Sequence, residues 1–145
     1  MSSENGALVD TFGRVHRDMR VSLTDRCSLR CNYCMPADFA EWIPGEHLLS
    51  TDEMMLVLEV ATEMGINQMR LTGGEPLLRP DVVDVVRRLN ALPNAPKISL
   101  TSNGLQLPKL AKDLADAGLE RVNVSLDTLD PQRFKEMTHR DLGRA

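Results

Sequence analysis

A short apolar stretch followed by an amphipathic helical stretch occurs four times along the chain, and this alternation constrains the fold more than any other feature. The apolar stretches predict strands at about 19–24, 68–72, 97–101 and 121–126. Apolar residues at helical spacing predict helices at about 51–64, 80–92, 109–117 and 131–139. Strands that alternate with helices favour an α/β fold, here about four βα units forming a parallel sheet with helical crossovers.

Residues with known positional preferences mark the ends of these helices. Ser50, with Glu53 three residues later, predicts a capping box that begins the first helix, and Gly65 ends it. Pro80 is expected at the first position of the second helix, and Gly118 just after the third. The connection from the first strand to Ser50 is therefore unusually long, which is typical of a functional loop.

Polar residues and glycines follow the predicted strands where each one ends. They are Thr24 and Asp25, the run 72–75, the run 101–103, and Ser125 with Asp127. In α/β folds with parallel strands the carboxyl ends share one edge of the sheet, and functional sites lie there. Each group taken singly is also what an ordinary turn contains. Four such groups on one edge, beside the long loop, predict a functional site.

All three cysteines of the chain, Cys27, Cys31 and Cys34, lie in that loop with the spacing C-x3-C-x2-C. Three thiolates supply three corners of a metal centre, and the chain has no fourth cysteine to close it. An open coordination position favours a reactive iron-sulfur centre that binds a substrate or cofactor. Two alternatives remain at this point: a zinc site completed by His16 or His47, and three unrelated buried thiols.

Composition excludes several classes of protein. The chain has 145 residues, of which 42% are hydrophobic, so it can form one globular domain over 1–145, with residues 1–11 as a mobile lead-in. A net charge of -4 and an aromatic content of 3% give no reason to expect nucleic acid or a membrane as partner. The odd cysteine count and an N-terminus without a signal-peptide pattern predict a cytoplasmic location.

The cysteine spacing, with Tyr33 before the last cysteine and Gly73-Gly74-Glu75-Pro76 after the second strand, resembles the radical S-adenosylmethionine (radical SAM) superfamily. The resemblance implies that Cys27, Cys31 and Cys34 bind a [4Fe-4S] cluster whose remaining iron is chelated by S-adenosyl-L-methionine. It also implies that Gly73, Gly74 and Glu75 lie against the methionine amino group of that cofactor. The expected fold becomes the N-terminal part of a partial TIM-like (βα)6 barrel.

The flanking residues resemble one group within that superfamily, the members that cyclise GTP in molybdenum cofactor biosynthesis. The segments that carry this resemblance are 11–14, 20–27, 33–36, 70–77 and 123–127. It implies that Tyr33, Gly74 and Ser125 contact S-adenosylmethionine. It further implies that Arg20, Arg70 and Thr101 contact GTP as substrate, although arginines on a strand can also be simple surface residues. The activity implied is that of a radical SAM lyase, which needs an electron donor.

The chain is shorter than those enzymes, which continue to six strands and a second, C-terminal cysteine triplet. We therefore expect 1–145 to be an N-terminal portion that assembles its cluster but does not turn over GTP. The fourth strand would leave an open sheet edge, so that a homodimer is one expected outcome. Two other functions stay open: a radical SAM enzyme acting on a peptide or other small molecule, and a non-catalytic metal-binding module.

Overall fold

The computed structural model describes residues 6–36, 38 and 41–141. Four parallel strands form one sheet in the order β1-β2-β3-β4. The strands are β1 (Asp18–Ser22), β2 (Gln68–Thr72), β3 (Lys97–Ser102) and β4 (Arg121–Val124). The helices are α1 (Thr51–Glu63), α2 (Val82–Asn90), α3 (Leu107–Asp116) and α4 (Pro131–Thr138), with short 3-10 turns at Gly45–His47 and Pro76–Leu78. The α/β prediction of four βα units is confirmed.

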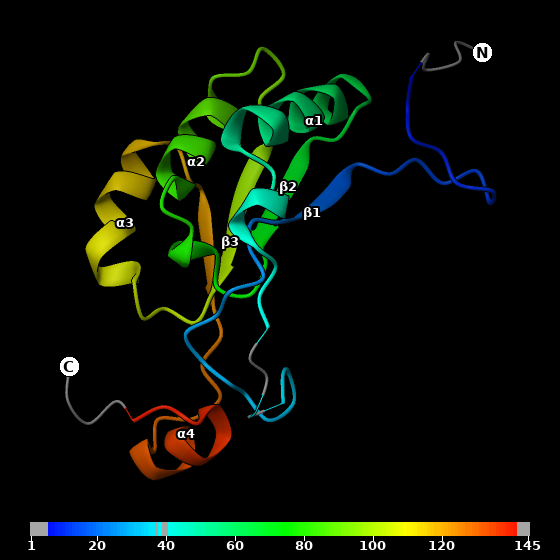
Figure 1. Ribbon diagram of the computed structural model, residues 1–145. Helices are drawn as coiled ribbons and strands as arrows, with labels where there is room; N and C mark the ends of the chain where they lie inside the picture. The colour runs from blue at the N-terminus through cyan, green and yellow to red at the C-terminus, as the bar shows by residue number, and fades with distance from the viewer. Residues whose placement is uncertain (1–5, 37, 39–40, 142–145) are drawn as a thin grey trace.

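Helices α1, α2 and α3 cover one face of the sheet, and α4 lies apart from them, beyond the carboxyl ends of the strands (Figure 1). The hydrophobic core lies between the sheet and the three helices. Met69 and Leu71 of β2, with Leu100 of β3, are at most 1% exposed and pack against the helices. Since side chains alternate along a strand, the residues between them point to the other face. That face is polar and is not covered by any helix of the described chain.

The helix ends follow the predicted signals, except that α3 begins at Leu107 and not at about 109 and that α2 begins after Pro80. Ser50 caps α1, accepting from the Glu53 N–H while its own N–H donates to the Glu53 carboxylate, so the capping box is present. Pro80 is not the first residue of α2, because Asp81 is the N-cap and the helix begins at Val82. A tight turn closed by a hydrogen bond from Val82 N to Arg79 O precedes the helix and takes up Pro80.

The lead-in and the edges of the sheet complete the description. Residues 1–5 of the expected lead-in lie outside the described residues, and farther on Val9 pairs with Val15 in an isolated antiparallel bridge. Strand β4 has β3 as its only partner within the described chain, so its outer edge is open there. Among the helices of the described residues, none is both long enough and apolar enough to span a bilayer.

Candidate active site

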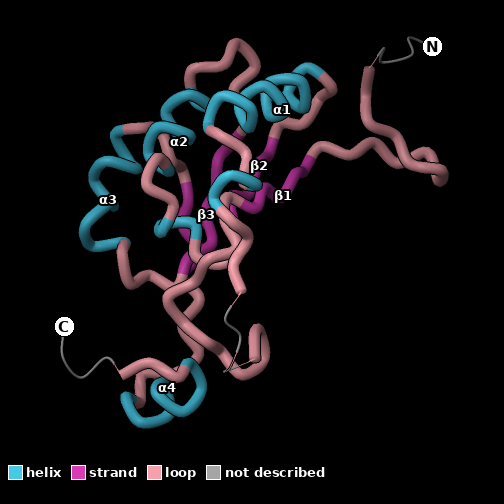
Figure 2. Tube along the Cα trace, in the orientation of Figure 1, coloured by secondary structure: helices cyan, strands magenta, loops and turns pink. Residues whose placement is uncertain are grey.

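The cysteine loop begins directly after β1 and passes beneath the sheet beside α4 (Figure 2). The backbone turns back at Cys31, whose carbonyl accepts from Cys34 N and Met35 N at 2.8 and 3.1 Å. The Cys27 sulfur accepts a hydrogen bond from Leu29 N at 3.4 Å. Cys27 and Cys31 are half-buried and Cys34 is exposed. The alternative of three buried core thiols is therefore wrong.

The cysteine loop also carries Tyr33, which contacts the segment after β4. Burial raises the pKa of the Cys31 thiol, and the charges of Cys27 and Cys34 raise it further. Next to them the Tyr33 hydroxyl donates to Asp127 Oδ2 at 2.7 Å, and this hydrogen bond raises the pKa of Tyr33. The hydrogen bond ties the cysteine loop to the segment after β4. Tyr33 remains 66% exposed and open to a ligand.

The donor set fits an iron-sulfur cluster better than a single metal ion. Within the residues that the structure describes, no three His, Cys, Asp or Glu side chains converge as a site for one ion. His16 lies instead 3.5 Å from the Asp10 carboxylate. A zinc ion would need its ligands on one atom, whereas a four-iron cluster binds each thiolate at a different iron. Three thiols on one loop, of which Cys34 is exposed and Cys27 and Cys31 are half-buried, are compatible with the second arrangement.

A buried oxygen without a partner lies next to this loop. Asp25 Oδ2 accepts from Ile43 N at 2.6 Å, while Oδ1 of the same carboxylate is buried and has no hydrogen-bond partner among the residues that the structure describes. Because buried polar atoms are nearly always satisfied, an oxygen of this kind suggests a group that completes the site. It lies two residues before Cys27, at the base of the proposed cluster loop.

The C-terminal end of α4 holds the cysteine loop in place. Arg30 N donates to Thr138 O and Asn32 N to Met137 O, both at 2.9 Å. The last carbonyls of a helix have no partner within the helix, so the loop satisfies groups that would otherwise need water. The sequence analysis did not find this contact, and no local signal could have shown it, because the paired segments are over 100 residues apart.

The Gly-Gly turn after β2 packs directly on the backbone that leads into the cysteine loop. Gly74 N donates to Thr24 O and Glu75 N to Arg26 O, both at 2.7 Å. A Cβ atom would lie 2.3 Å from Thr24 O at Gly73 and 2.3 Å from Arg26 O at Gly74. Gly73 also has φ of 147°, a conformation that other residues rarely adopt. The two glycines are needed because the two backbone segments approach so closely.

Glu75 points into the protein and not into an open site. Glu75 is buried, with 1% of its surface exposed. One carboxylate oxygen accepts from Leu77 N at 3.1 Å and from the Ser102 hydroxyl at 2.8 Å. The other accepts from Asn103 N at 2.7 Å. A role of Glu75 in binding the cofactor remains a prediction, and the structure shows that its carboxylate joins the turn after β2 to the end of β3.

The arginines expected to bind substrate lie side by side on the uncovered face of the sheet. Arg20 of β1 is in register with Arg70 of β2, and Arg70 with Ser99 of β3. Arg121 of β4 extends the same row, since it is in register with Ser99. Two adjoining hollows of about 350 and 160 Å³ lie along this row, and Arg70 lines both. The sequence analysis missed Arg121, although the alternation of polar residues in β4 would have placed it on this face.

Thr101 and Ser125 lie closer to the carboxyl ends of the strands. Thr101 is in register with Asn123, and Ser125 N donates to Ser102 O at 2.8 Å just beyond β4. Ser125 thus lies two residues from Asp127, which holds Tyr33. Of the expected cofactor residues, Gly74 and Ser125 lie at the strand ends, and of the expected substrate residues, Arg20 and Arg70 lie deeper on the open face.

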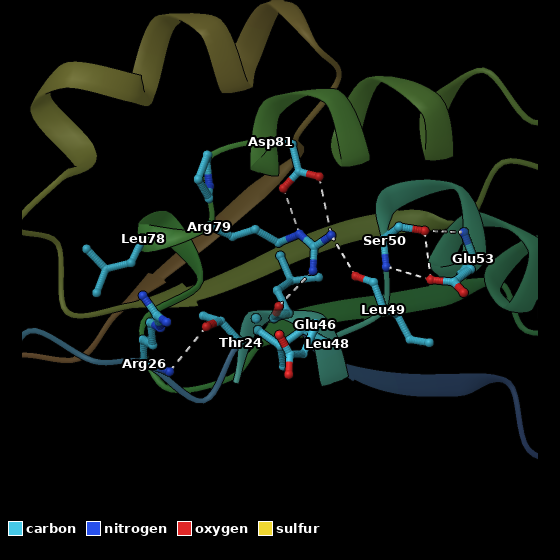
Figure 3. A pocket seen from close by; sticks show the side chains of 13 residues that line it. Thr24, Arg26, Glu46, Leu48, Leu49, Ser50, Glu53, Leu78, Arg79 and Asp81 are labelled. Atoms are coloured by element: carbon cyan, nitrogen blue, oxygen red, sulfur yellow. Dashed lines mark hydrogen bonds and ion pairs between the residues drawn. The ribbon is translucent and has the colours of Figure 1, made fainter. Parts of the chain in front are cut away.

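A further hollow, of about 550 Å³, lies elsewhere, between the start of the cysteine loop and the starts of α1 and α2 (Figure 3). Arg79 crosses it and uses its donors internally, at 2.7 Å on Asp81 and at 3.0 and 3.2 Å on the carbonyls of Leu23 and Leu49. The Arg79 guanidinium is hydrogen-bonded to groups of the pocket wall, so we interpret this pocket as a structural contact between the loop and the two helices. The functional residues converge instead on the strand ends and the open face.

Comparison with known proteins adds a family and relatives to this geometry. Residues 21–145 match the model of the radical SAM superfamily. The chain is 54% identical over 137 residues to the GTP 3',8-cyclase of Mycobacterium sp. (strain KMS), covering 94% of this chain and 39% of the relative. It is 53% identical over 143 residues to the GTP 3',8-cyclase of Streptomyces coelicolor, covering 97% of this chain and 42% of the relative. The chain thus spans about two fifths of the length of these curated relatives.

Two solved structures share the fold. Streptococcus suis SuiB bound to S-adenosylmethionine superposes with a TM-score of 0.67 at 19% identity, over 86% of this chain and 28% of SuiB. BtrN in complex with AdoMet and 2-DOIA gives a TM-score of 0.59 at 15% identity, over 86% of this chain and 51% of BtrN. At these identities the likeness extends to the arrangement of strands and helices only.

Proposed function

The chain belongs to the radical SAM superfamily, and on that premise we propose that it is the N-terminal portion of a GTP 3',8-cyclase of molybdenum cofactor biosynthesis. The full reaction would convert GTP to 3',8-cyclo-7,8-dihydroguanosine 5'-triphosphate. The observation that carries the proposal is the register of Arg20 with Arg70 on the open face, next to the strand ends that hold the cysteine loop. Relatives with this name at 53–54% identity support it.

Cys27, Cys31 and Cys34 would hold a [4Fe-4S] cluster with one iron left for S-adenosyl-L-methionine. Bound together, these cofactors supply a carbon-centred radical that can take a hydrogen atom from a substrate. Around them Tyr33 and Ser125 offer hydroxyl groups at the strand ends. A reactive radical requires that water be kept away, and because Cys34 and Tyr33 are exposed in 1–145, the bound cofactor and the rest of the full-length protein would have to cover this position.

Gly73, Gly74 and Glu75 would form the wall against the methionine end of the cofactor. The exposed surface of this turn is backbone, because glycines carry no side chain and the Glu75 carboxylate is turned inward. Backbone carbonyls are suitable acceptors for an ammonium group. The turn can therefore orient the cofactor without a free side chain.

Arg20, Arg70 and Thr101 would bind GTP on the open face. Neighbouring strands lie about 4.8 Å apart, so two arginines in register present adjacent guanidinium forks. Such forks bind phosphate oxygens through paired, charge-assisted hydrogen bonds. Thr101 adds a hydroxyl nearer the strand ends. In this proposal the phosphates would lie deep on the face and the ribose toward the radical.

The remaining partners follow from the same proposal. One-electron chemistry needs an external electron donor, and an oxygen-sensitive cluster suits the reducing cytoplasm. For residues 1–145 alone, the outer edge of β4, which is open within the described chain, would be the surface through which a second copy pairs in a homodimer.

Anaerobic reconstitution of the protein in the full length that its gene encodes tests the proposal. With dithionite, S-adenosylmethionine and GTP we expect 5'-deoxyadenosine and the cyclised guanosine nucleotide in equal amounts. Arg70→Gln should weaken GTP binding by about tenfold, since one charge-assisted interaction is lost, while Arg87→Gln on the exposed side of α2 should leave it unchanged. Formation of 5'-deoxyadenosine without cyclised product would indicate a different substrate. Uptake of zinc and never of iron would refute the cluster itself.

A further inference from the structure

We infer that Glu75 is a positioning residue that anchors the cysteine loop through Asn103 and Ser28, and that its carboxylate is not a ligand of S-adenosylmethionine. The inference rests on the proposed cluster site at Cys27, Cys31 and Cys34. It concerns a chain of two contacts, from Glu75 to Asn103 and from Asn103 to Ser28, which joins the turn after β2, the end of β3 and the cluster loop.

The first contact is made by the Glu75 carboxylate. It has three donors: the backbone N–H groups of Leu77 and Asn103 and the hydroxyl of Ser102. The residue is 1% exposed, so the carboxylate cannot reach a ligand in the open site. A buried carboxylate is tolerated only where hydrogen bonds replace its lost hydration, and three donors from two strand ends do so here.

The second contact passes from Asn103 to the cysteine loop. While its backbone N–H donates to Glu75, the Asn103 side-chain amide donates to the Ser28 hydroxyl at 3.2 Å. Its amide oxygen accepts from Leu105 N at 3.1 Å, which fixes the orientation of the side chain. Ser28 directly follows Cys27. The anchor therefore ends one residue from a proposed cluster ligand.

A second group of contacts reaches the same loop from another side. The Arg140 guanidinium donates to Ser28 O at 3.2 Å, and Arg30 donates to Cys27 O at 2.9 Å while its guanidinium lies 4.7 Å from the Trp42 ring centre. These contacts hold the loop against α4 and the segment before α1. Among the side-chain hydrogen bonds of the described residues, the one between Asn103 and Ser28 alone joins the first part of the loop to the end of β3.

The chemistry explains why a carboxylate is needed at position 75. Glutamine would keep the shape but place an NH2 group where a carboxylate oxygen now accepts, so that a donor would face a donor. The end of β3 would then lose its fixed place against the Gly-Gly turn, and Asn103 would shift with it. We therefore expect the cluster loop to separate from the end of β3 more often. The backbone surface of the Gly-Gly turn, which would contact the cofactor, keeps the same chemical groups.

Variants along the anchor test this in the reconstituted full-length protein. Ser28→Ala and Asn103→Ala should each speed anaerobic loss of iron to a chelator by about three- to tenfold, the factor associated with one hydrogen bond. Because both remove the same contact, the double variant should lose iron no faster than Asn103→Ala alone. Glu75→Gln should lose iron at least as fast as Asn103→Ala and should alter the electron paramagnetic resonance signal of the reduced cluster. Asn94→Ala and Glu59→Gln, both at exposed positions, are the matched controls.

Amide hydrogen exchange of the metal-free protein gives a readout that needs no cluster. The anchor variants should exchange faster at residues 26–34, with α1 and α2 unchanged. If Ser28→Ala and Asn103→Ala behave like the controls, or if their effects multiply, the anchor does not exist. If Glu75→Gln weakens S-adenosylmethionine binding with normal iron retention and normal exchange, Glu75 is a direct ligand and the inference is wrong. Failure of the unchanged protein to take up iron would count against the proposed function alone.

Discussion

Replacing Gly74 with alanine should detach the Gly-Gly turn from the base of the cysteine loop. The added Cβ would lie 2.3 Å from Arg26 O, 2.4 Å from Asp25 O and 2.6 Å from Arg26 C. All three are backbone atoms, which cannot rotate away as a side-chain end can. The φ angle of Gly74 is not positive, so the cost comes from the contact and not from the backbone conformation.

The magnitude follows from the distances. Ordinary contacts begin near 3.4 Å, so the loop must move by about 1 Å. That shift breaks or lengthens the 2.7 Å hydrogen bonds from Gly74 N to Thr24 O and from Glu75 N to Arg26 O. Overpacking costs about 1–3 kcal/mol and each of the two lost hydrogen bonds about 1 kcal/mol, so the lower end of the expected loss is about 3 kcal/mol. For a chain of this size the melting temperature should fall by about 10 °C.

Thermal unfolding of the metal-free protein, followed by circular dichroism, measures this effect. Gly45→Ala is the matched control, because a Cβ there meets nothing within 4 Å and Gly45 has no positive φ. It should melt within about 2 °C of the unchanged protein. Gly74→Ala should also retain less iron after reconstitution, since Arg26 precedes Cys27. Equal melting temperatures for the two alanine variants would refute the close packing of turn and loop.

Three further predictions follow from other contacts. Arg79→Met should lower the free energy of unfolding by about 3 kcal/mol, because it removes the donor that Arg79 supplies to Asp81 and to two backbone carbonyls. The control Arg87→Met should leave the urea midpoint unchanged. Equal urea midpoints for the two variants would contradict this prediction. Hydrogen bonds from Ser50 lower the pKa of Glu53 below its ordinary 4.5, so the stabilisation is present above that pH and is lost as the pH falls through the lowered value. Glu53→Gln should therefore make the melting temperature fall less steeply with decreasing pH on the acid side. An unchanged slope of melting temperature against pH would disprove this. The 145-residue chain alone should assemble a cluster but not cyclise GTP, and turnover as fast as that of the full-length protein would overturn this expectation.

The sequence determined the elements and their order. The alternation of apolar residues, the Ser50 capping box and Gly118 act over a few residues, and the structure has the corresponding strands and helices. The spacing of the cysteines likewise placed three thiols on one turn. These features are local, so neighbouring residues along the chain contain all the information needed. The exception was Pro80, where a tight turn at Arg79 delayed the start of α2.

Only the tertiary structure decided which distant groups meet. The register that sets Arg20 beside Arg70, and Arg121 in the same row, depends on which strands pair and with what offset. The inward turn of Glu75 and the contact of Asn103 with Ser28 join segments 27 and 75 residues apart. A pattern in sequence gives the face of a strand but not its neighbour, because pairing is set by packing of the whole sheet against its helices. The sequence therefore supplied the functional groups, and long-range packing determined which of them act together.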